Sequence, residues 1–171
     1  MAISGSCKPR RRNVVERSKG VAAAGEPTIV ITRTVDAPRD LVWKVWTDPA
    51  HIARWWGPNG FTNTIHAMDV RPGGTWRYIM HGPDGTDYPN EIVYREVVKP
   101  ARLVYDHSGA EEGDMHSFRA TVTFTERDGK TEIRMTSVFP SVEARDAVMK
   151  FGAVEGGCQT LDRLAAYLPK I

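Results

Sequence analysis

Two histidines share predicted strand faces with apolar residues, an arrangement that suits acid–base chemistry in an apolar cavity. His107 alternates with Leu103 and Tyr105, and His116 alternates with Phe118, so we expect both imidazoles on the inward face of a sheet. Because imidazole titrates near neutral pH, an inward pair is suited to proton transfer or to orienting a ligand. Two hydrogen-bonded histidines at strand ends would explain the same pattern without any chemistry.

Acidic side chains flank the apolar stripe of the C-terminal segment. At 100° per residue, Glu155 lies about 70° and Asp162 about 50° from the centre of that stripe. Either carboxylate would reach a cavity mouth, where apolar surroundings favour proton transfer. Solvated charges beside an amphipathic helix are the alternative. Cys158 lies on the stripe and has no basic neighbour, which favours an inert thiol. The catalytic candidates are therefore His107, His116 and Glu155.

Motifs for other chemistries are absent from the sequence. There is no H-E-x-x-H and no paired C-x-x-C, so we predict no metal site. The glycines within 73–74 and 82–85 lie between predicted strands, whereas a phosphate-binding loop joins a strand to a helix. No G-x-S-x-G elbow occurs, so an acyl-transfer triad is unsupported. We also predict no cofactor.

Aromatic and methionine side chains recur at every second position of several predicted strands. In residues 75–81, Trp76, Tyr78 and Met80 fall on one face. Residues 118–124 and 133–139 carry matching rows. Such rows form either an ordinary packed core or the wall of an adaptable apolar pocket.

Two adjacent tryptophans precede a Gly-Pro break. Trp55 and Trp56 would act either as a lid over such a pocket or as a plug at one end of the barrel-like sheet. The ligand-binding candidates from all these patterns are Trp56, Trp76, Tyr78, Met80, His116, Phe118, Met135, Phe151 and Cys158.

These side chains need a sheet to position them. Alternating β-branched and apolar runs, bounded by turn residues, predict seven strands, over residues 28–36, 61–70, 75–81, 88–98, 102–107, 115–126 and 131–139. Asp128-Gly129 joins the last two strands and is a strong hairpin signal. Pro38 and Asp48-Pro49 start two short helices between the first two strands.

The remaining predicted element is a helix over residues 141–168. Apolar residues recur there at steps of three and four, and Ser141 is suited to cap the first free amides. A helix of this length spans about 42 Å and is the one predicted element long enough to cover the sheet. We predict an α+β fold in which a curved, seven-stranded antiparallel sheet grips this C-terminal helix, with a cavity between them.

The formal charge of the 171-residue chain is +2, but it is unevenly distributed. Residues 1–26 contain six basic and two acidic residues without periodicity, which predicts a basic, disordered tail, either a simple leader or an organelle-targeting segment. Residues 27–171 form the domain, whose net charge of −2 offers no surface for nucleic acid. We expect no secretory signal and no membrane span. Two cysteines form no disulfide framework, which favours the cytoplasm.

Four motifs follow one another along the predicted domain: Val35-Asp36-Ala37-Pro38 leading into Leu41-Val42-Trp43, then Trp55-Trp56-Gly57-Pro58, then Asp69-Val70-Arg71-Pro72-Gly73-Gly74, and finally Leu161-Asp162-Arg163-Leu164. With the order of elements, they resemble the SRPBCC (START-like, helix-grip) superfamily over roughly residues 28–168. Within it, the chain is similar to the branch named for the C-terminal domain of the heat-shock-protein ATPase activator.

The resemblance implies an internal apolar cavity that binds a lipid, a hormone, a polyketide or another hydrophobic small molecule. It carries over no catalytic residues, because this branch shares no catalytic set. One departure is visible: the family usually has an aromatic residue after the first glycine of the pair that is Gly156-Gly157 here. The missing side chain predicts more room or more flexibility in the middle of the helix.

We therefore predict that the chain binds a small hydrophobic molecule between sheet and helix, as a carrier, a sensor or a means of sequestration. An enzyme of the cyclase or hydrolase type, using the same cavity, is the first alternative. A co-chaperone that regulates a heat-shock ATPase is the second, disfavoured because the activator carries an additional N-terminal domain. Neither the ligand nor the oligomeric state follows from the sequence.

Overall fold

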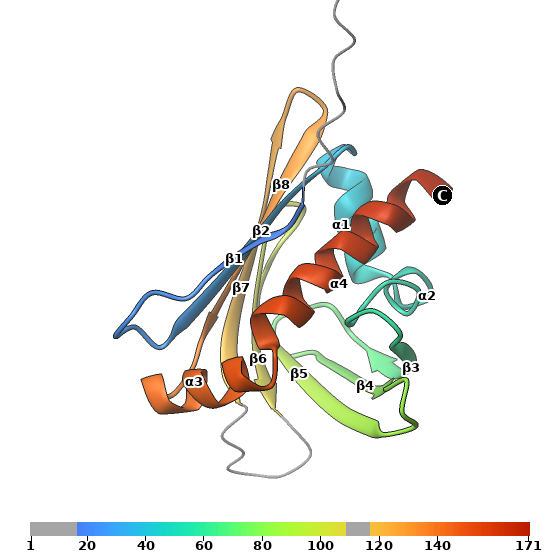
Figure 1. The fold of residues 1–171 in the computed structure, drawn as a ribbon. Coiled ribbons are helices and arrows are strands. Elements are labelled where there is room, and N and C mark those ends of the chain that lie inside the picture. The colour runs from blue at the N-terminus through green and yellow to red at the C-terminus, as the bar shows by residue number, and fades with distance from the viewer. Residues whose placement is uncertain (1–16, 109–116) are drawn as a thin grey trace, which may run out of the picture.

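An eight-stranded antiparallel sheet curves around a C-terminal helix in the computed structural model of the chain (Figure 1). The structure describes residues 17–108 and 117–171. The strand order across the sheet is β1-β2-β8-β7-β6-β5-β4-β3. The strands are β1 Lys19–Val21, β2 Thr28–Val35, β3 Thr62–Met68, β4 Thr75–His81, β5 Asp87–Val98, β6 Arg102–Ser108, β7 Phe118–Arg127 and β8 Lys130–Val138. The helices are α1 Arg39–Thr47, α2 Pro49–Ile52, α3 Val142–Lys150 and α4 Ala153–Tyr167, followed by a 3-10 turn, η1 Leu168–Lys170.

The predicted α+β architecture is confirmed, including the two short helices between the first long strand and the second. The Asp48 side chain accepts a hydrogen bond from the amide of Ala50 at 2.9 Å, which caps α2, and Pro49 occupies its first position. At the β7–β8 turn, Asp128 and Gly129 both have positive φ, 53° and 75°. This backbone twist matches that of the flanking strands, so the hairpin register is set locally.

The sheet has eight strands rather than the predicted seven, because β1 adds to its edge. This strand lies within residues 1–26, so the prediction of a disordered tail is wrong for residues 19–21. Three residues carry no detectable alternation, and the strand exists because it pairs antiparallel with β2. Long-range contacts hold it there: Asp162 on α4 accepts hydrogen bonds from the amide and hydroxyl of Ser18, and Arg145 on α3 donates to the carbonyls of Ala23 and Glu26. Residues 1–16 of the predicted tail lie outside the described residues.

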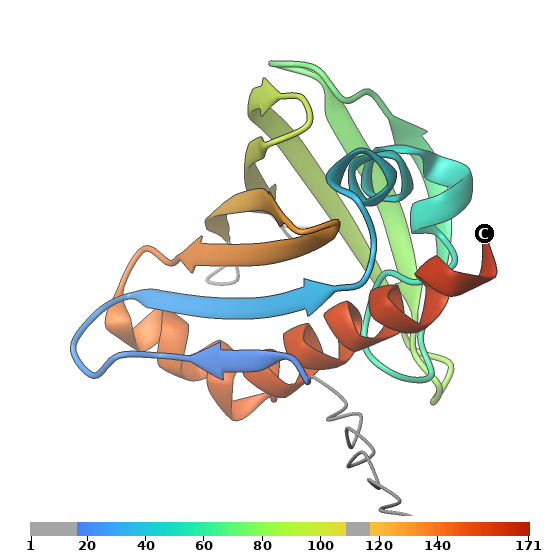
Figure 2. The ribbon, with the colours of Figure 1, turned by 90° about the horizontal axis from the view of Figure 1, so that it is seen from above.

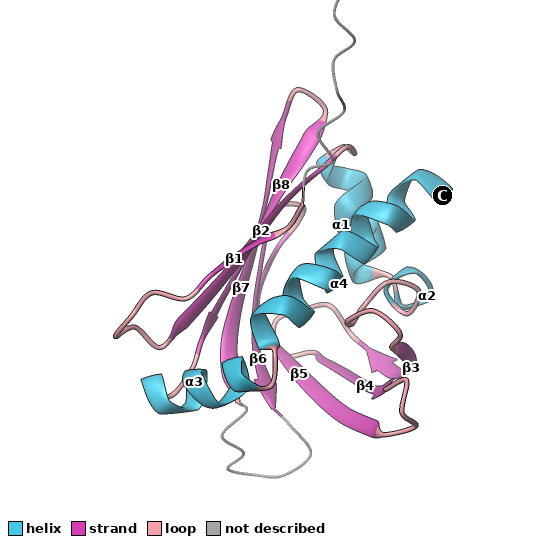
Figure 3. Ribbon diagram, in the orientation of Figure 1, coloured by secondary structure: helices cyan, strands magenta, loops and turns pink. Residues whose placement is uncertain are grey.

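The predicted single helix over residues 141–168 is two helices, α3 and α4 (Figure 3). Ser141 caps the first as predicted, since its hydroxyl accepts from the amide of Ala144 at 3.0 Å. The break falls at Phe151-Gly152, where Gly152 adopts a left-handed φ of 81° that only glycine adopts easily. Phe151, expected on the buried stripe, is consequently 86% exposed.

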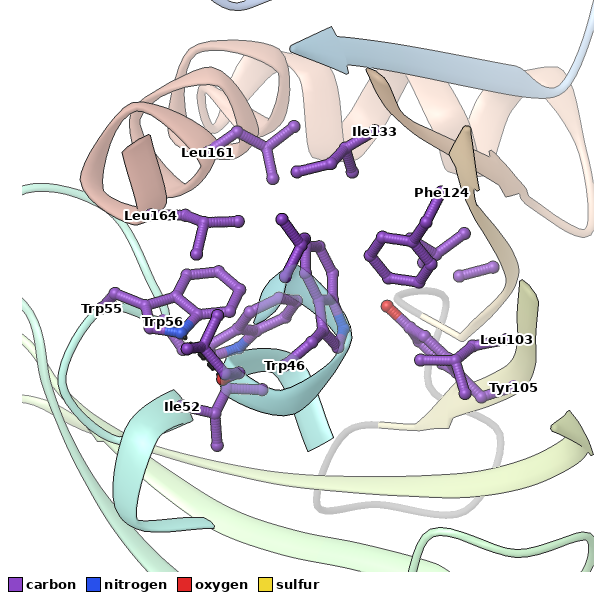
Figure 4. Packing of buried hydrophobic residues seen from close by; sticks show 14 of the residues in the cluster. Trp46, Ile52, Trp55, Trp56, Leu103, Tyr105, Phe124, Ile133, Leu161 and Leu164 are labelled. Carbon is purple, nitrogen blue, oxygen red and sulfur yellow. Dashed lines mark hydrogen bonds between the residues drawn. The ribbon is translucent and has the colours of Figure 1, made fainter. Parts of the chain in front are cut away.

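The main core fills one end of the space between sheet and helix. There, Trp46 on α1 and Trp55 after α2 pack against Leu161 and Leu164 of α4, all at most 1% exposed (Figure 4). Figure 2 shows α4 running beside β1 and β2, which the contacts between these elements confirm. Within residues 17–108 and 117–171, every helix is too short or too polar to cross a lipid bilayer.

Candidate ligand cavity

A cavity of about 370 Å³ lies between the sheet and the α3–α4 junction, and it borders the tryptophan-rich core at Trp56. Its volume falls within the range of small-molecule sites. The sheet side is lined by Ile29, Ile31, Tyr78, Met80, Asn90, Tyr105, His107, Phe118, Met135, Ser137 and Phe139. The helical side is lined by Val148, Phe151, Gly152, Ala153, Gly156, Gly157 and Thr160, together with the loop residues Trp56, Gly57 and Pro58.

Two adjacent glycines bring α4 close to its neighbours beside the cavity. A Cβ atom on Gly157 would lie 2.1 Å from Cδ1 of Ile31, and one on Gly156 would lie 3.3 Å from Cγ of Pro58. The helix therefore approaches both neighbours closely without filling the space beside them. The Gly156-Gly157 pair departs from the expected family pattern, and it lies in the cavity wall.

Six of the predicted ligand-binding residues line this cavity, although nothing bound there tests their role. They come from the loop after α2, three strands and the helical break: Trp56, Tyr78, Met80, Phe118, Met135 and Phe151.

Two other candidates are placed elsewhere. Trp76 lies behind the cavity wall, 1% exposed, with its ring stacked on Tyr78 at 4.2 Å. Cys158 is turned toward β1, where its Sγ lies 3.3 Å from the position of a Cβ on Gly20. Burial, with Asp162 and Glu155 nearby, raises the pKa of the Cys158 thiol and so disfavours a nucleophilic thiolate. His116 lies outside the described residues.

One predicted acid–base residue, His107, reaches the cavity. Its Nε2 lies 2.8 Å from Oδ1 of Asn90, to which it donates, and its ring stacks on Phe118 at 4.6 Å. Glu155 is exposed, hydrogen-bonds Nε2 of Gln159 at 3.2 Å, and is not among the described lining residues. The predicted pairing of His107 with His116 stays a prediction. These positions fix the imidazole as an oriented polar group on an aromatic wall.

Two tyrosines supply further polar atoms in the cavity wall. The indole Nε1 of Trp56 donates to the hydroxyl of Tyr78 at 3.2 Å. Tyr105, 2% exposed, was not among the predicted binding residues. The signal that would have found it was available, since Tyr105 shares strand parity with His107. Burial raises the pKa of both phenols, Tyr78 and Tyr105, above the ordinary range.

The loop that carries Trp56 is fastened to α4 by a side chain that the sequence did not single out. Nη1 of Arg163 donates to the carbonyls of Trp56, Gly57 and Pro58 at 3.2, 2.8 and 2.9 Å. Partial burial lowers the pKa of this guanidinium, which stays charged. Trp56 itself is 9% exposed and packs edge-on against Trp46 and Trp76. It therefore closes one end of the cavity, and of the two predicted roles its packing corresponds to the plug.

Metal-binding geometry does not occur in the described ranges: no three His, Cys, Asp or Glu side chains there converge as ligands. The polar atoms of the wall are phenols, an amide, an imidazole and hydroxyls. This set can orient an organic ligand by hydrogen bonds, while the aromatic and aliphatic surfaces bury the rest of it.

Comparisons with known proteins place the chain in a family. Residues 36–169 match the family described as Activator of Hsp90 ATPase homolog 1-like protein. A solution structure of a protein from Arthrobacter aurescens is 26% identical, with a TM-score of 0.83 over 90% of this chain and 92% of that one. The crystal structure of Ms6760 from Mycobacterium smegmatis is 28% identical, with a TM-score of 0.77 over 86% and 96%.

A more distant neighbour is DynU16, a protein of the dynemicin biosynthetic locus. It is 23% identical, with a TM-score of 0.64 over 84% of this chain and 48% of that one, a likeness that concerns the fold alone. A search of curated proteins found no significant match. The match over residues 36–169 and the sheet that grips α4 agree, and the chain belongs to the Activator of Hsp90 ATPase homolog 1-like family of the SRPBCC superfamily.

Proposed function

We propose that this protein binds a small, mainly apolar molecule in the cavity between the sheet and the α3–α4 junction, as a carrier or sensor in the cytoplasm. The observation that supports this is the cavity itself: about 370 Å³ walled by aromatic, methionine and aliphatic side chains. Concave, mainly apolar sites of this size with a few polar groups are typical of small-molecule binding sites.

The predicted alternatives have less support. An acid–base enzyme needs two groups at one reacting atom, but Glu155 is not among the described lining residues, and His107 is held by Asn90. A co-chaperone, as the family's name suggests, would act through its outer surface and has no use for the cavity. The carrier or sensor function uses the cavity directly.

The proposal is tested by filling the cavity from the helix side. Ala153 opens α4 and lines the cavity, so a phenylalanine there occupies the ligand's space. Ala166 is exposed on the same helix, which makes Ala166→Phe the matched control. The probe is N-phenyl-1-naphthylamine, an uncharged dye whose fluorescence rises in apolar surroundings. We expect the full chain and Ala166→Phe to bind it alike, and Ala153→Phe to bind at least about tenfold more weakly.

Thermal denaturation of each variant confirms that it is folded before titration. Equal binding by all three proteins would place the dye on the surface and contradict the proposal. An absence of fluorescence enhancement with the unmodified chain would contradict it as well.

A further inference from the structure

Tyr105 presents a phenol hydroxyl in the wall of the cavity. The side chain projects from β6 into the interior (Figure 4), is 2% exposed and lines the cavity. None of the residues in the described ranges forms a hydrogen bond with its hydroxyl. The hydroxyl therefore keeps its hydrogen for an acceptor that enters the cavity.

The hydroxyl of Tyr78, the second phenol of the wall, accepts a hydrogen bond but donates none to the described residues. The Tyr78 hydroxyl accepts from Nε1 of Trp56 at 3.2 Å, which fixes its position but leaves its own hydrogen. Among the described residues, that hydrogen has no acceptor either. A hydroxyl can donate one hydrogen bond while it accepts another. Tyr78 and Tyr105 therefore both have a proton to donate into the same cavity.

Both phenols stay protonated over the physiological pH range. Burial raises the pKa of Tyr105 well above its ordinary value, and the nearby Tyr78 and Tyr94 raise it further. Burial likewise raises the pKa of Tyr78. The two groups are thus neutral hydrogen-bond donors. They can bind a ligand that carries a hydrogen-bond acceptor, but they cannot act as the anionic partner of a cationic ligand.

The rest of the wall sets the charge of the ligand. The described lining residues include no Lys, Arg, Asp or Glu. A charged group in this cavity would lose its hydration without gaining a counter-ion, at a large cost. Flat surfaces are abundant, since the rings of Trp56, Phe118 and Phe139 join the two tyrosines in the wall. Such surfaces favour ring systems over flexible chains.

We propose that the ligand is an uncharged, ring-containing molecule with a carbonyl-type oxygen that accepts hydrogen bonds from the hydroxyls of both Tyr105 and Tyr78. The two tyrosines together then distinguish a ketone from a hydrocarbon of the same shape. This inference rests on the proposed function, because it concerns the occupant of the same cavity.

Three probes with the same fused rings separate the contributions of the ring system, the carbonyl group and a negative charge to the affinity. Fluorene is the hydrocarbon, 9-fluorenone adds one carbonyl, and 9-fluorenone-2-carboxylate adds a charge. With the full chain, we expect fluorenone to bind about tenfold more tightly than fluorene, the difference that one good hydrogen bond supplies. The carboxylate should bind at least about tenfold more weakly than fluorenone. The carbonyl stretching band of bound fluorenone should lie at the lower frequency of a hydrogen-bonded ketone.

Three variants locate the donors. Tyr105→Phe and Tyr78→Phe should each reduce the preference for fluorenone over fluorene and leave the affinity for fluorene within about twofold. Their double variant should lose the preference and restore the frequency of a free carbonyl. The control is Tyr94→Phe, which removes a buried phenol whose ring lies 6.2 Å from that of Tyr105 but which is not in the described wall. It should keep the full preference.

The outcomes distinguish the inference from the proposed function. Equal affinities for fluorene and fluorenone, or tightest binding of the carboxylate, would overturn the inference while ligand binding in the cavity stands. The inference also fails if N-phenyl-1-naphthylamine binds but neither fused-ring probe does. Failure of all three uncharged molecules to bind would overturn both.

Discussion

The two ends of the space between sheet and helix are built from the same elements but filled differently. At one end, Leu161 and Leu164 of α4 reach into a tryptophan cluster and are completely buried. At the other end, one to two turns earlier on the same helix, Gly156 and Gly157 lie in the wall of a cavity of about 370 Å³. Along one helix, large side chains therefore fill a core at one end, and glycines border a cavity at the other.

The difference also separates stability from function within one helix. Close-packed side chains make many small attractive contacts, so we expect the leucine end to contribute more than the glycine end to holding α4 in place. The glycine end gives up such contacts and can accommodate a ligand instead. Substitutions at the first end should therefore change unfolding, and those at the second should change binding.

The largest expected effect is at the packed end. Leu161→Ala should lower the free energy of unfolding by about 3 kcal/mol, because it removes a fully buried side chain and leaves a void among tryptophans. Phe151→Ala, at the cavity mouth and 86% exposed, should lower it by less than about 0.5 kcal/mol. Urea denaturation followed by tryptophan fluorescence measures both. Equal losses would show that the two ends contribute alike and would remove the basis of the comparison.

A smaller effect is expected where the two ends meet. Arg163→Met removes three hydrogen bonds from a charged donor to the loop of Trp56, Gly57 and Pro58. We expect a loss of about 2 kcal/mol in the free energy of unfolding, since the carbonyls keep their burial but lose their donor. The control is Arg102→Met, which breaks an exposed ion pair with Glu96 at 3.2 Å and should cost less than about 1 kcal/mol. A loss no greater than that of the control would mean that packing alone holds the loop.

Local signals in the sequence were sufficient for most of the sheet and for the helix caps. Asp128-Gly129 specifies its turn through backbone conformations available to those two residues, and Ser141 and Asp48 cap helices through their own side chains. Each of these features depends on neighbours within a few residues. Alternation in β4 likewise placed Tyr78 and Met80 on the inner face.

Features that depend on distant partners were missed. Strand β1 is held through Ser18, which hydrogen-bonds Asp162, 144 residues away along the chain. Three residues are too few to show the periodicity of a strand. The left-handed Gly152 interrupts a spacing that continues smoothly in the sequence, so Phe151 turns outward. Because β1 lies beside α4, the side chain of Cys158 is next to Gly20 of that strand. The sequence pattern, which does not reveal β1, had placed Cys158 in the cavity wall. Space between elements is a property of the packed structure, and the sequence pattern does not contain it.

The smallest expected effect concerns how the sheet is held at the cavity end, where less core lies beneath it. Asp106, one residue before His107, is on the opposite face and bridges neighbouring strands: Oδ1 accepts from Nε of Arg119 and Oδ2 from Nε of Arg95, both at 2.7 Å. The hydrogen bond from Arg119, aided by Arg95, lowers the pKa of the Asp106 carboxyl below its ordinary value.

A carboxyl whose pKa is lower in the folded state stabilises the protein above the pKa of the unfolded chain, about 3.9, and this contribution is lost as the pH falls through the folded-state pKa. Asp106→Asn should therefore lower the free energy of unfolding by less than about 1 kcal/mol at pH 7, because the cluster is partly exposed. The difference from the unmodified protein should stay constant down to about pH 5 and shrink below about pH 4. Urea titrations at each pH measure it, and Arg119→Gln in the Asp106→Asn background should add little, because the pair acts as a unit. A difference that persists unchanged at pH 2 would assign the effect of Asp106→Asn to packing rather than to charge.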